Sequence, residues 1–183
     1  EGLISIRSEA NTRELTAVDP VRQAARQRAM APLLKRYMER GAAGELKWNS
    51  TLFPTPAYAL EANMSLRDFE DFVFAACYCD REDPVGAWRA MHAEQQRAID
   101  WLRGRDVVRI TGTEVDLTLS VKGRTFINSD GRHNMPSGEI FTGPVETTAN
   151  GWVRFNYPAV SGGREVEGIE LHFEDGRVVS ASA

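Results

Sequence analysis

Cysteine and histidine are scarce in this chain of 183 residues, which holds two cysteines and three histidines. One residue separates Cys77 from Cys79, a spacing that would place them about 200° apart on a helix. A disulfide between them is therefore not expected, and reduced thiols of a cytoplasmic protein are the better interpretation. No His-Glu-x-x-His motif and no cysteine pair at zinc spacing occurs, so no complete zinc site follows from local motifs.

Long apolar runs and an excess of positive charge are also missing. No stretch approaches the roughly 20 apolar residues that span a bilayer. The 22 basic and 26 acidic residues give a net charge of −4, which offers no electrostatic reason to expect nucleic acid or an anionic membrane as a partner. With 42% hydrophobic and 26% charged residues, the composition is typical of a folded globular protein and excludes the disordered and coiled-coil classes.

Helix signals dominate residues 1–104. Asp19-Pro20 predicts a helix start, Gly41 predicts its end, and Pro32 should kink or split the helix between them. Further elements expected here are strands over residues 3–6 and 45–53, a short helix over 58–62, a helix opened by the capping box at Ser65, and a helix from Asp83-Pro84 to Gly104.

After Gly104 the apolar period changes from 3.6 to 2, which predicts antiparallel strands, including a strict alternation over residues 115–121. Glu174-Asp175-Gly176 predicts a hairpin turn, and Gly162-Gly163 predicts another turn. We therefore expect an α+β fold of two parts. Residues 1–104 form a mainly helical α/β part, and residues 105–183 form the β-rich first portion of a second domain.

The most unusual stretch is a loop rich in glycine and proline over residues 128–146. It concentrates Asp130, Arg132, His133 and Glu139 within ten residues. Glu139 precedes Ile140-Phe141, which should hold its carboxylate at a strand edge in a partly dry pocket. Such a carboxylate can bind a divalent ion or act as a base, although spacing alone favours a turn with solvated charges.

The other histidines add no ligands to this loop. We expect His92 to be a core or boundary residue of its helix, and His172 to face the side of its sheet opposite Leu171 and Phe173. One carboxylate cannot make a catalytic metal site, which usually needs about three protein ligands. No catalytic residue is therefore assigned from the residues alone.

Several motifs resemble the thermophilic metalloaminopeptidases of peptidase family M29. The longest is residues 131–146, which read GRHNMPSGEIFTGPVE. Further matches are IRSEANTREL at 6–15, TLFPTP at 51–56, Asp83-Pro84, VRFNYPAV at 153–160 and GGREVEG at 162–168. The resemblance covers essentially the whole chain.

The resemblance implies a homodimeric enzyme that removes residues one at a time from the amino ends of peptide substrates. It also implies two divalent ions, cobalt, zinc or magnesium, that activate a water, with Glu139 as the first metal-ligand glutamate. The family's remaining glutamate, histidine and aspartate ligands lie beyond the equivalent of Ala183. We therefore expect this chain to be an internal fragment that is inactive alone.

Two other interpretations stay open at this stage. The chain could be a non-catalytic binding or dimerisation module that keeps the scaffold without the chemistry. Alternatively, the loop from Asp130 to Glu139 could bind a peptide amine through Glu139 alone.

Overall fold

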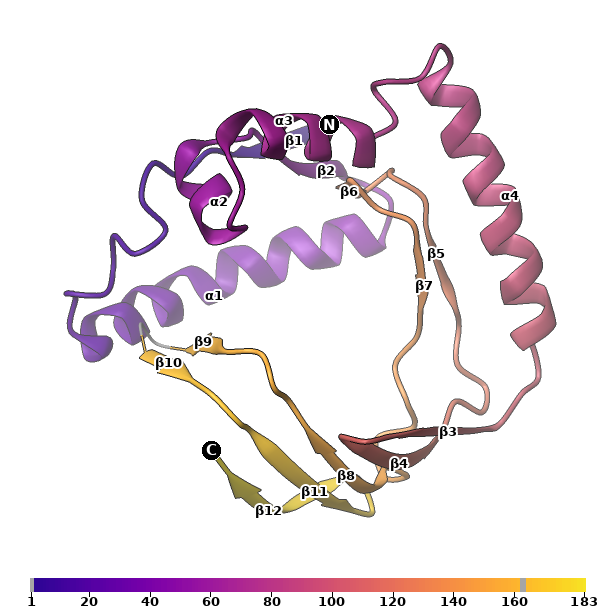
Figure 1. The fold of residues 1–183 in the computed structure, drawn as a ribbon. Coiled ribbons are helices and arrows are strands. Elements are labelled where there is room, and N and C mark those ends of the chain that lie inside the picture. Colours follow the sequence, from indigo (N-terminus) through magenta and orange to yellow (C-terminus); the bar gives the residue numbers. More distant parts are fainter. Residues whose placement is uncertain (1, 162–163) are drawn as a thin grey trace. The chain divides into compact units, whose positions relative to one another are not determined.

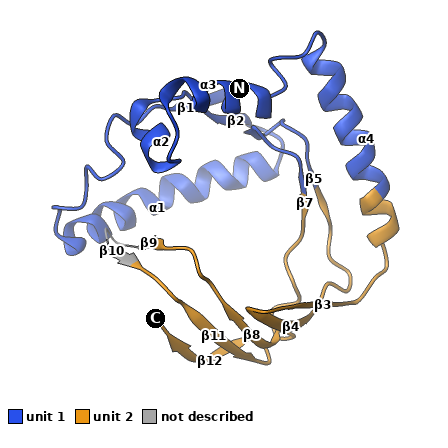
Figure 2. Cartoon of the chain, in the orientation of Figure 1, with its two compact units in different colours: residues 1–97, 128–139 blue, residues 98–127, 140–183 orange. Residues whose placement is uncertain are grey.

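A computed structural model describes residues 2–161 and 164–183, so the turn expected at Gly162-Gly163 lies outside the described residues. The chain divides into two compact units (Figure 2). Unit 1 holds residues 1–97 and 128–139, and unit 2 holds residues 98–127 and 140–183. The chain passes between the units after residues 97, 127 and 139. The domains expected at 1–104 and 105–183 remain a prediction.

Unit 1 is built on a three-stranded sheet in the order β1-β2-β6. Strand β2 (Lys47–Leu52) lies parallel to β1 (Gly2–Arg7) on one side and to β6 (Asn134–Met135) on the other. The strands expected near residues 3–6 and 45–53 are thus confirmed. The helices of this part of the chain are α1 (Pro20–Ala42), α2 (Pro56–Glu61), α3 (Leu66–Ala76) and α4 (Pro84–Leu102) (Figure 1). The last turns of α4 belong to unit 2 (Figure 2).

Side-chain caps set the helix starts. Asp19 accepts a hydrogen bond from the amide of Val21 and is followed by Pro at the first helical position. Ser65 caps α3 by accepting from the amide of Asp68 at 3.1 Å. Both starts confirm the sequence prediction.

The expectation that Pro32 could split the first helix is wrong, because α1 runs unbroken from Pro20 to Ala42. Proline deprives the carbonyl four residues earlier, that of Arg28, of its usual partner. Arg28 and Pro32 are both exposed, so water can satisfy that carbonyl.

Unit 2 contains a five-stranded antiparallel sheet in the order β12-β11-β8-β4-β3. Its strands are β3 (Val107–Gly112), β4 (Val115–Ser120), β8 (Asn150–Arg154), β11 (Glu170–Glu174) and β12 (Arg177–Ser182).

Two short ladders complete the described strands: β5 (Ile127–Ser129) with β7 (Glu139–Phe141), and β9 (Ala159–Ser161) with β10 (Arg164–Val166). The helices together with antiparallel sheets confirm the α+β class.

Two glycines in unit 2 allow a close approach of strands and a tight turn. Gly151 has φ +123°, and a Cβ there would lie 2.0 Å from the carbonyl oxygen of Asp116 on the neighbouring strand. Gly176 has φ +78° and follows Asp175, whose φ is 47°. Such values are typical of tight hairpin turns, and the expected hairpin between β11 and β12 is confirmed.

The buried apolar cluster of unit 1 lies around α2 and α3. Ala59, Phe69 and Val73 form it, and Leu52 and Tyr58 pack against it. A search of the described residues finds no helix long and apolar enough to cross a membrane.

Candidate functional site

Strand β2 holds the glycine- and proline-rich segment 128–139. The amide of Ser50 donates to the carbonyl of His133 at 2.7 Å, and the Asn49 side chain donates to the carbonyl of Gly131 at 2.9 Å. The His133 ring stacks on Trp48, with 4.7 Å between ring centroids. The segment is therefore fixed to the sheet of unit 1 by backbone and side-chain contacts.

Asp130 is the centre of a charged network in this segment. Its carboxylate accepts from Nε of Arg132 at 2.9 Å on each oxygen and contacts the Arg132 NH2 group at 2.7 Å. Nδ1 of His92, on α4, lies 2.8 Å from Oδ2 of Asp130. The Asp130 side chain is only 9% exposed. Hydrogen bonding and charge from Arg132, opposed by burial, lower the pKa of Asp130 to about 2, so the carboxylate is ionised at neutral pH.

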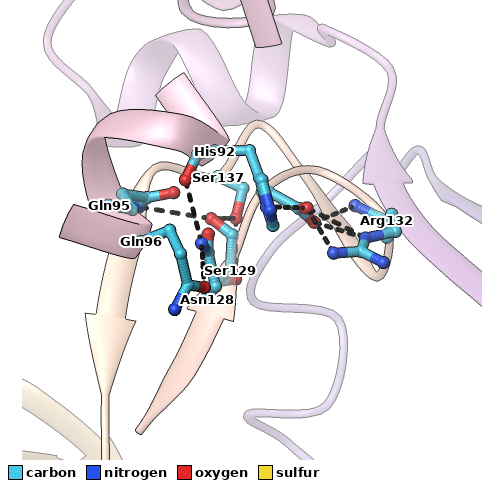
Figure 3. A network of polar contacts seen from close by, with 8 residues as sticks. His92, Gln95, Gln96, Asn128, Ser129, Arg132 and Ser137 are labelled. Carbon is cyan, nitrogen blue, oxygen red and sulfur yellow. Dashed lines mark hydrogen bonds and ion pairs between the residues drawn. The ribbon is translucent and has the colours of Figure 1, made fainter. Parts of the chain in front are cut away.

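Two serines brace the segment just before Glu139. Ser137 Oγ donates to the carbonyl of Ser129 at 2.9 Å, and the two hydroxyl oxygens lie 2.7 Å apart (Figure 3). Because the only hydroxyl proton of Ser137 is used on that carbonyl, Ser129 must donate in the second contact. The amide of Gly138 also donates to the carbonyl of Ser129, at 3.1 Å.

Carboxamides of α4 and β5 extend this network. Asn128 donates to the carbonyl of His92 at 3.0 Å, and Gln95 donates to the carbonyl of Ser129 at 3.5 Å. The buried amide oxygens of Gln95 and Asn128 have no partner among the described residues. Each of these oxygens can accept a further hydrogen bond, for example from water.

Glu139 is the first residue of β7 and is exposed. Within the described part of the chain its carboxylate makes no hydrogen bond or ion pair. The partly dry pocket expected around it is therefore not seen. Alternation with Ile140 sets which way a strand side chain points, but it cannot show whether another layer covers that side of the short β5-β7 ladder.

Glu139 also lacks neighbouring ligands. Among the side chains that the structure describes, those of residues 2–159 and 166–183, no group of three or more His, Cys, Asp or Glu could hold a metal ion. A catalytic divalent site usually takes about three protein ligands. The described residues alone therefore do not fit a complete metal site, and Glu139 would supply a single carboxylate.

A pocket of about 680 Å³ opens in unit 1 beside the Asp130 network. Its apolar wall includes Pro84, Val85, Trp88 and Met135, and its polar lining includes Arg89. The remaining lining residues are Cys77, Cys79, His92, Asp130, Gly131 and Arg132. Sequence reasoning did not predict this pocket.

The expectation for His92 is confirmed. It is a partly buried boundary residue of α4, and its ring is satisfied by Asp130, 38 residues away. No local spacing signals a contact at that separation. Nε2 of His172 lies 2.9 Å from Glu170, two residues earlier on the same strand. The i, i+2 spacing in an alternating strand could have indicated that pair.

Comparison with known proteins places the chain in a family. The model of the family described as thermophilic metalloprotease (M29) matches residues 1–183. Aminopeptidase 2 of Geobacillus stearothermophilus is 31% identical over 92% of this chain and 45% of its own length. Aminopeptidase T of Thermus thermophilus is 27% identical over 96% of this chain and 47% of its own length.

A solved structure supports the fold independently. Wild-type AmpT from Thermus thermophilus matches with a TM-score of 0.78 at 22% identity, over 98% of this chain and 48% of that one. The chain thus spans about half the length of the relatives it matches. Since the family model covers every residue, this chain belongs to the M29 family of thermophilic metalloproteases.

Proposed function

We propose that this chain is part of a metal-dependent aminopeptidase, which hydrolyses the amino-terminal residues of peptides. The observation that carries the proposal is the match of the M29 family model to residues 1–183. The names of the relatives agree, since those described above are called aminopeptidases. A cytoplasmic homodimer that works on peptide substrates, with no nucleic-acid or membrane partner, is part of the same proposal.

Glu139 is the residue we propose as a metal ligand. Ser137 and Gly138 hold the backbone just before it through three contacts with Ser129. The Glu139 carboxylate itself is unpaired within the described residues, so it is available to a cation. A single carboxylate is too little for a divalent ion. We propose that residues outside this sequence supply the other ligands of two divalent ions, cobalt, zinc or magnesium.

Activity assays on the complete gene product and on residues 1–183 test the proposal. Aminoacyl-4-nitroanilides with added cobalt should be hydrolysed by the product of the complete gene and not by residues 1–183 alone. Clear turnover by residues 1–183 would refute the proposal that they hold only part of the metal site. If the complete product is folded and supplied with each of the three metals but shows no turnover, the proposal that it is an aminopeptidase is refuted.

Metal content tests the role of Glu139 separately. In the complete product, Glu139→Ala should lower the bound metal per subunit as well as the rate. Glu146→Ala is a matched control, because Glu146 is an exposed carboxylate of unit 2 that pairs with Arg124. Metal content equal to the control would remove Glu139 from the site.

A non-catalytic binding or dimerisation module is the second candidate. The absence of a three-ligand cluster among the described residues favours it. So does the apolar surface of α1, where Leu33, Leu34 and Met38 are all more than half exposed. A stop codon directly after Ala183 would support the module, whereas an open reading frame that adds Glu, His and Asp residues would support the enzyme.

A further inference from the structure

The pocket beside Trp88 has the size and lining of a small-molecule site. Its volume of about 680 Å³ falls within the ~300–1,000 Å³ that ligand pockets commonly have. It lies wholly in unit 1, between the start of α4, the end of α3 and residues 130–135. Glu139 is not among its lining residues.

The aromatic wall is held in place. The Trp88 indole N–H donates to the carbonyl of Cys77 at 3.0 Å, and the Tyr78 ring packs 5.0 Å from the Trp88 ring. A side chain at Gly131 would place its Cβ 2.7 Å from Cε of Met135 and 3.5 Å from the Trp88 ring. The glycine therefore keeps this wall clear, and the wall offers a flat apolar surface for a ring or a branched chain.

The charges of the lining select an anion. The only carboxylate in the lining, Asp130, is already engaged by Arg132 and His92. Asp130 thus offsets the charge of Arg132 and has little left to attract a ligand cation. Arg89 also lines the pocket and makes no hydrogen bond or ion pair within the part of the chain that the structure describes. Arg89 and Arg132 against the single carboxylate of Asp130 leave the described lining with one uncompensated positive charge.

We propose that this pocket binds small organic acids with an apolar body, with Trp88 against the body and Arg89 against the carboxylate. Arginine suits this role because its planar guanidinium matches a carboxylate with two parallel hydrogen bonds. The proposal is independent of the aminopeptidase assignment, since it uses neither Glu139 nor a metal.

A matched pair of probes tests the charge preference in the 183-residue chain. By isothermal titration calorimetry, 3-phenylpropanoate should bind with a Kd of about 1 mM, as expected for a small molecule of this size. The uncharged 3-phenylpropanamide, which has the same apolar body, should bind about fivefold more weakly, the scale of one exposed ion pair. Equal affinity for the two probes, or no saturable heat with the acid, would overturn the proposal.

Two pairs of variants locate the site. Arg89→Gln should remove the preference for the acid over the amide, whereas Arg97→Gln, at another exposed arginine of α4, should keep it. Binding of the acid should change the tryptophan fluorescence of Trp101→Phe and leave that of Trp88→Phe unchanged. Circular dichroism checks that each variant is folded. If Trp88→Phe does not fold, the arginine pair alone decides, and identical behaviour of Arg89→Gln and Arg97→Gln refutes the site.

Discussion

Nδ1 of His92 lies 2.8 Å from Oδ2 of Asp130. Because Asp130 is ionised and can only accept, Nδ1 of His92 carries the proton in this hydrogen bond. The contact joins α4 to the segment that carries Glu139. It is the central link of the network around which the candidate site is built.

The Asp130 network should make the stability of the protein depend on pH. The pKa of the Asp130 carboxyl is lowered from 3.8 to about 2 in the folded protein. The contribution of this carboxylate to the free energy of unfolding is therefore fully present above pH ~4 and is lost as pH falls toward ~2. Asp130→Asn should lower the free energy of unfolding at pH 7 by about 1–2 kcal/mol, with a smaller loss near pH 2. Urea unfolding at the two pH values measures this. Asp71→Asn, an exposed carboxylate of α3, is the control, and an equal effect of both variants would contradict the prediction.

Gly151 should tolerate no side chain. In Gly151→Ala the new Cβ would meet the carbonyl oxygen of Asp116 at 2.0 Å, at a φ of +123°, so β8 and β4 would have to separate. We expect a loss of at least ~3 kcal/mol, a magnitude seen when backbone strain and lost pairing combine. Guanidinium unfolding checks it. Gly112→Ala is the matched control in the same sheet, since its Cβ would make an ordinary 3.5 Å contact with Val115.

The cap of α3 should have a measurable energy. Ser65→Ala removes the acceptor for the amide of Asp68 and should cost about 1 kcal/mol of stability. Ser65→Thr should retain most of it, because threonine keeps a hydroxyl that can accept from this amide and donate to the Asp68 carboxylate. Thermal unfolding of the three proteins orders them, and an alanine variant as stable as the wild type would show that the cap contributes nothing.

The two cysteines should react at different rates. Cys79 is exposed, whereas Cys77 is partly buried, and burial, with a smaller effect of the neighbouring Cys79, raises the pKa of the Cys77 thiol. Since the thiolate is the reactive form, iodoacetamide at pH 8 should label Cys79 several times faster than Cys77. Mass spectrometry of Cys77→Ser and Cys79→Ser separates the two rates. Faster labelling of Cys77 would contradict the burial described here.

Patterns within one element were readable from the sequence, and contacts between distant elements were not. Asp19, Ser65 and the Asp175-Gly176 turn act on residues a few positions away, so their chemistry alone predicts a cap or a hairpin. The prediction that Cys77 and Cys79 form no disulfide is confirmed, since both are free, but its premise was wrong. It assumed a continuous helix, whereas α3 ends at Ala76 and Tyr78 has φ 61°.

The candidate site was only partly predictable. The run of glycine, proline and charged residues singled out segment 128–139 as a shaped loop, and family resemblance singled out Glu139 within it. The His92–Asp130 contact and the pocket at Trp88 depend on α4 meeting a segment about 40 residues later. Periodicity contains no information about such a meeting. The exposure of Glu139 likewise depends on which layers pack on β7.

The threefold passage of the chain between its compact units has a consequence for dissection of the protein. A single cut near residue 97 leaves segment 128–139 attached to the wrong piece. The amino-terminal piece would then lack β6, the partner of β2, together with Asp130, the partner of His92. Expression of either half as one continuous stretch should give a poorly folded product. A circularly permuted gene, or co-expression of pieces that restore this segment, is the route to studying unit 1 on its own.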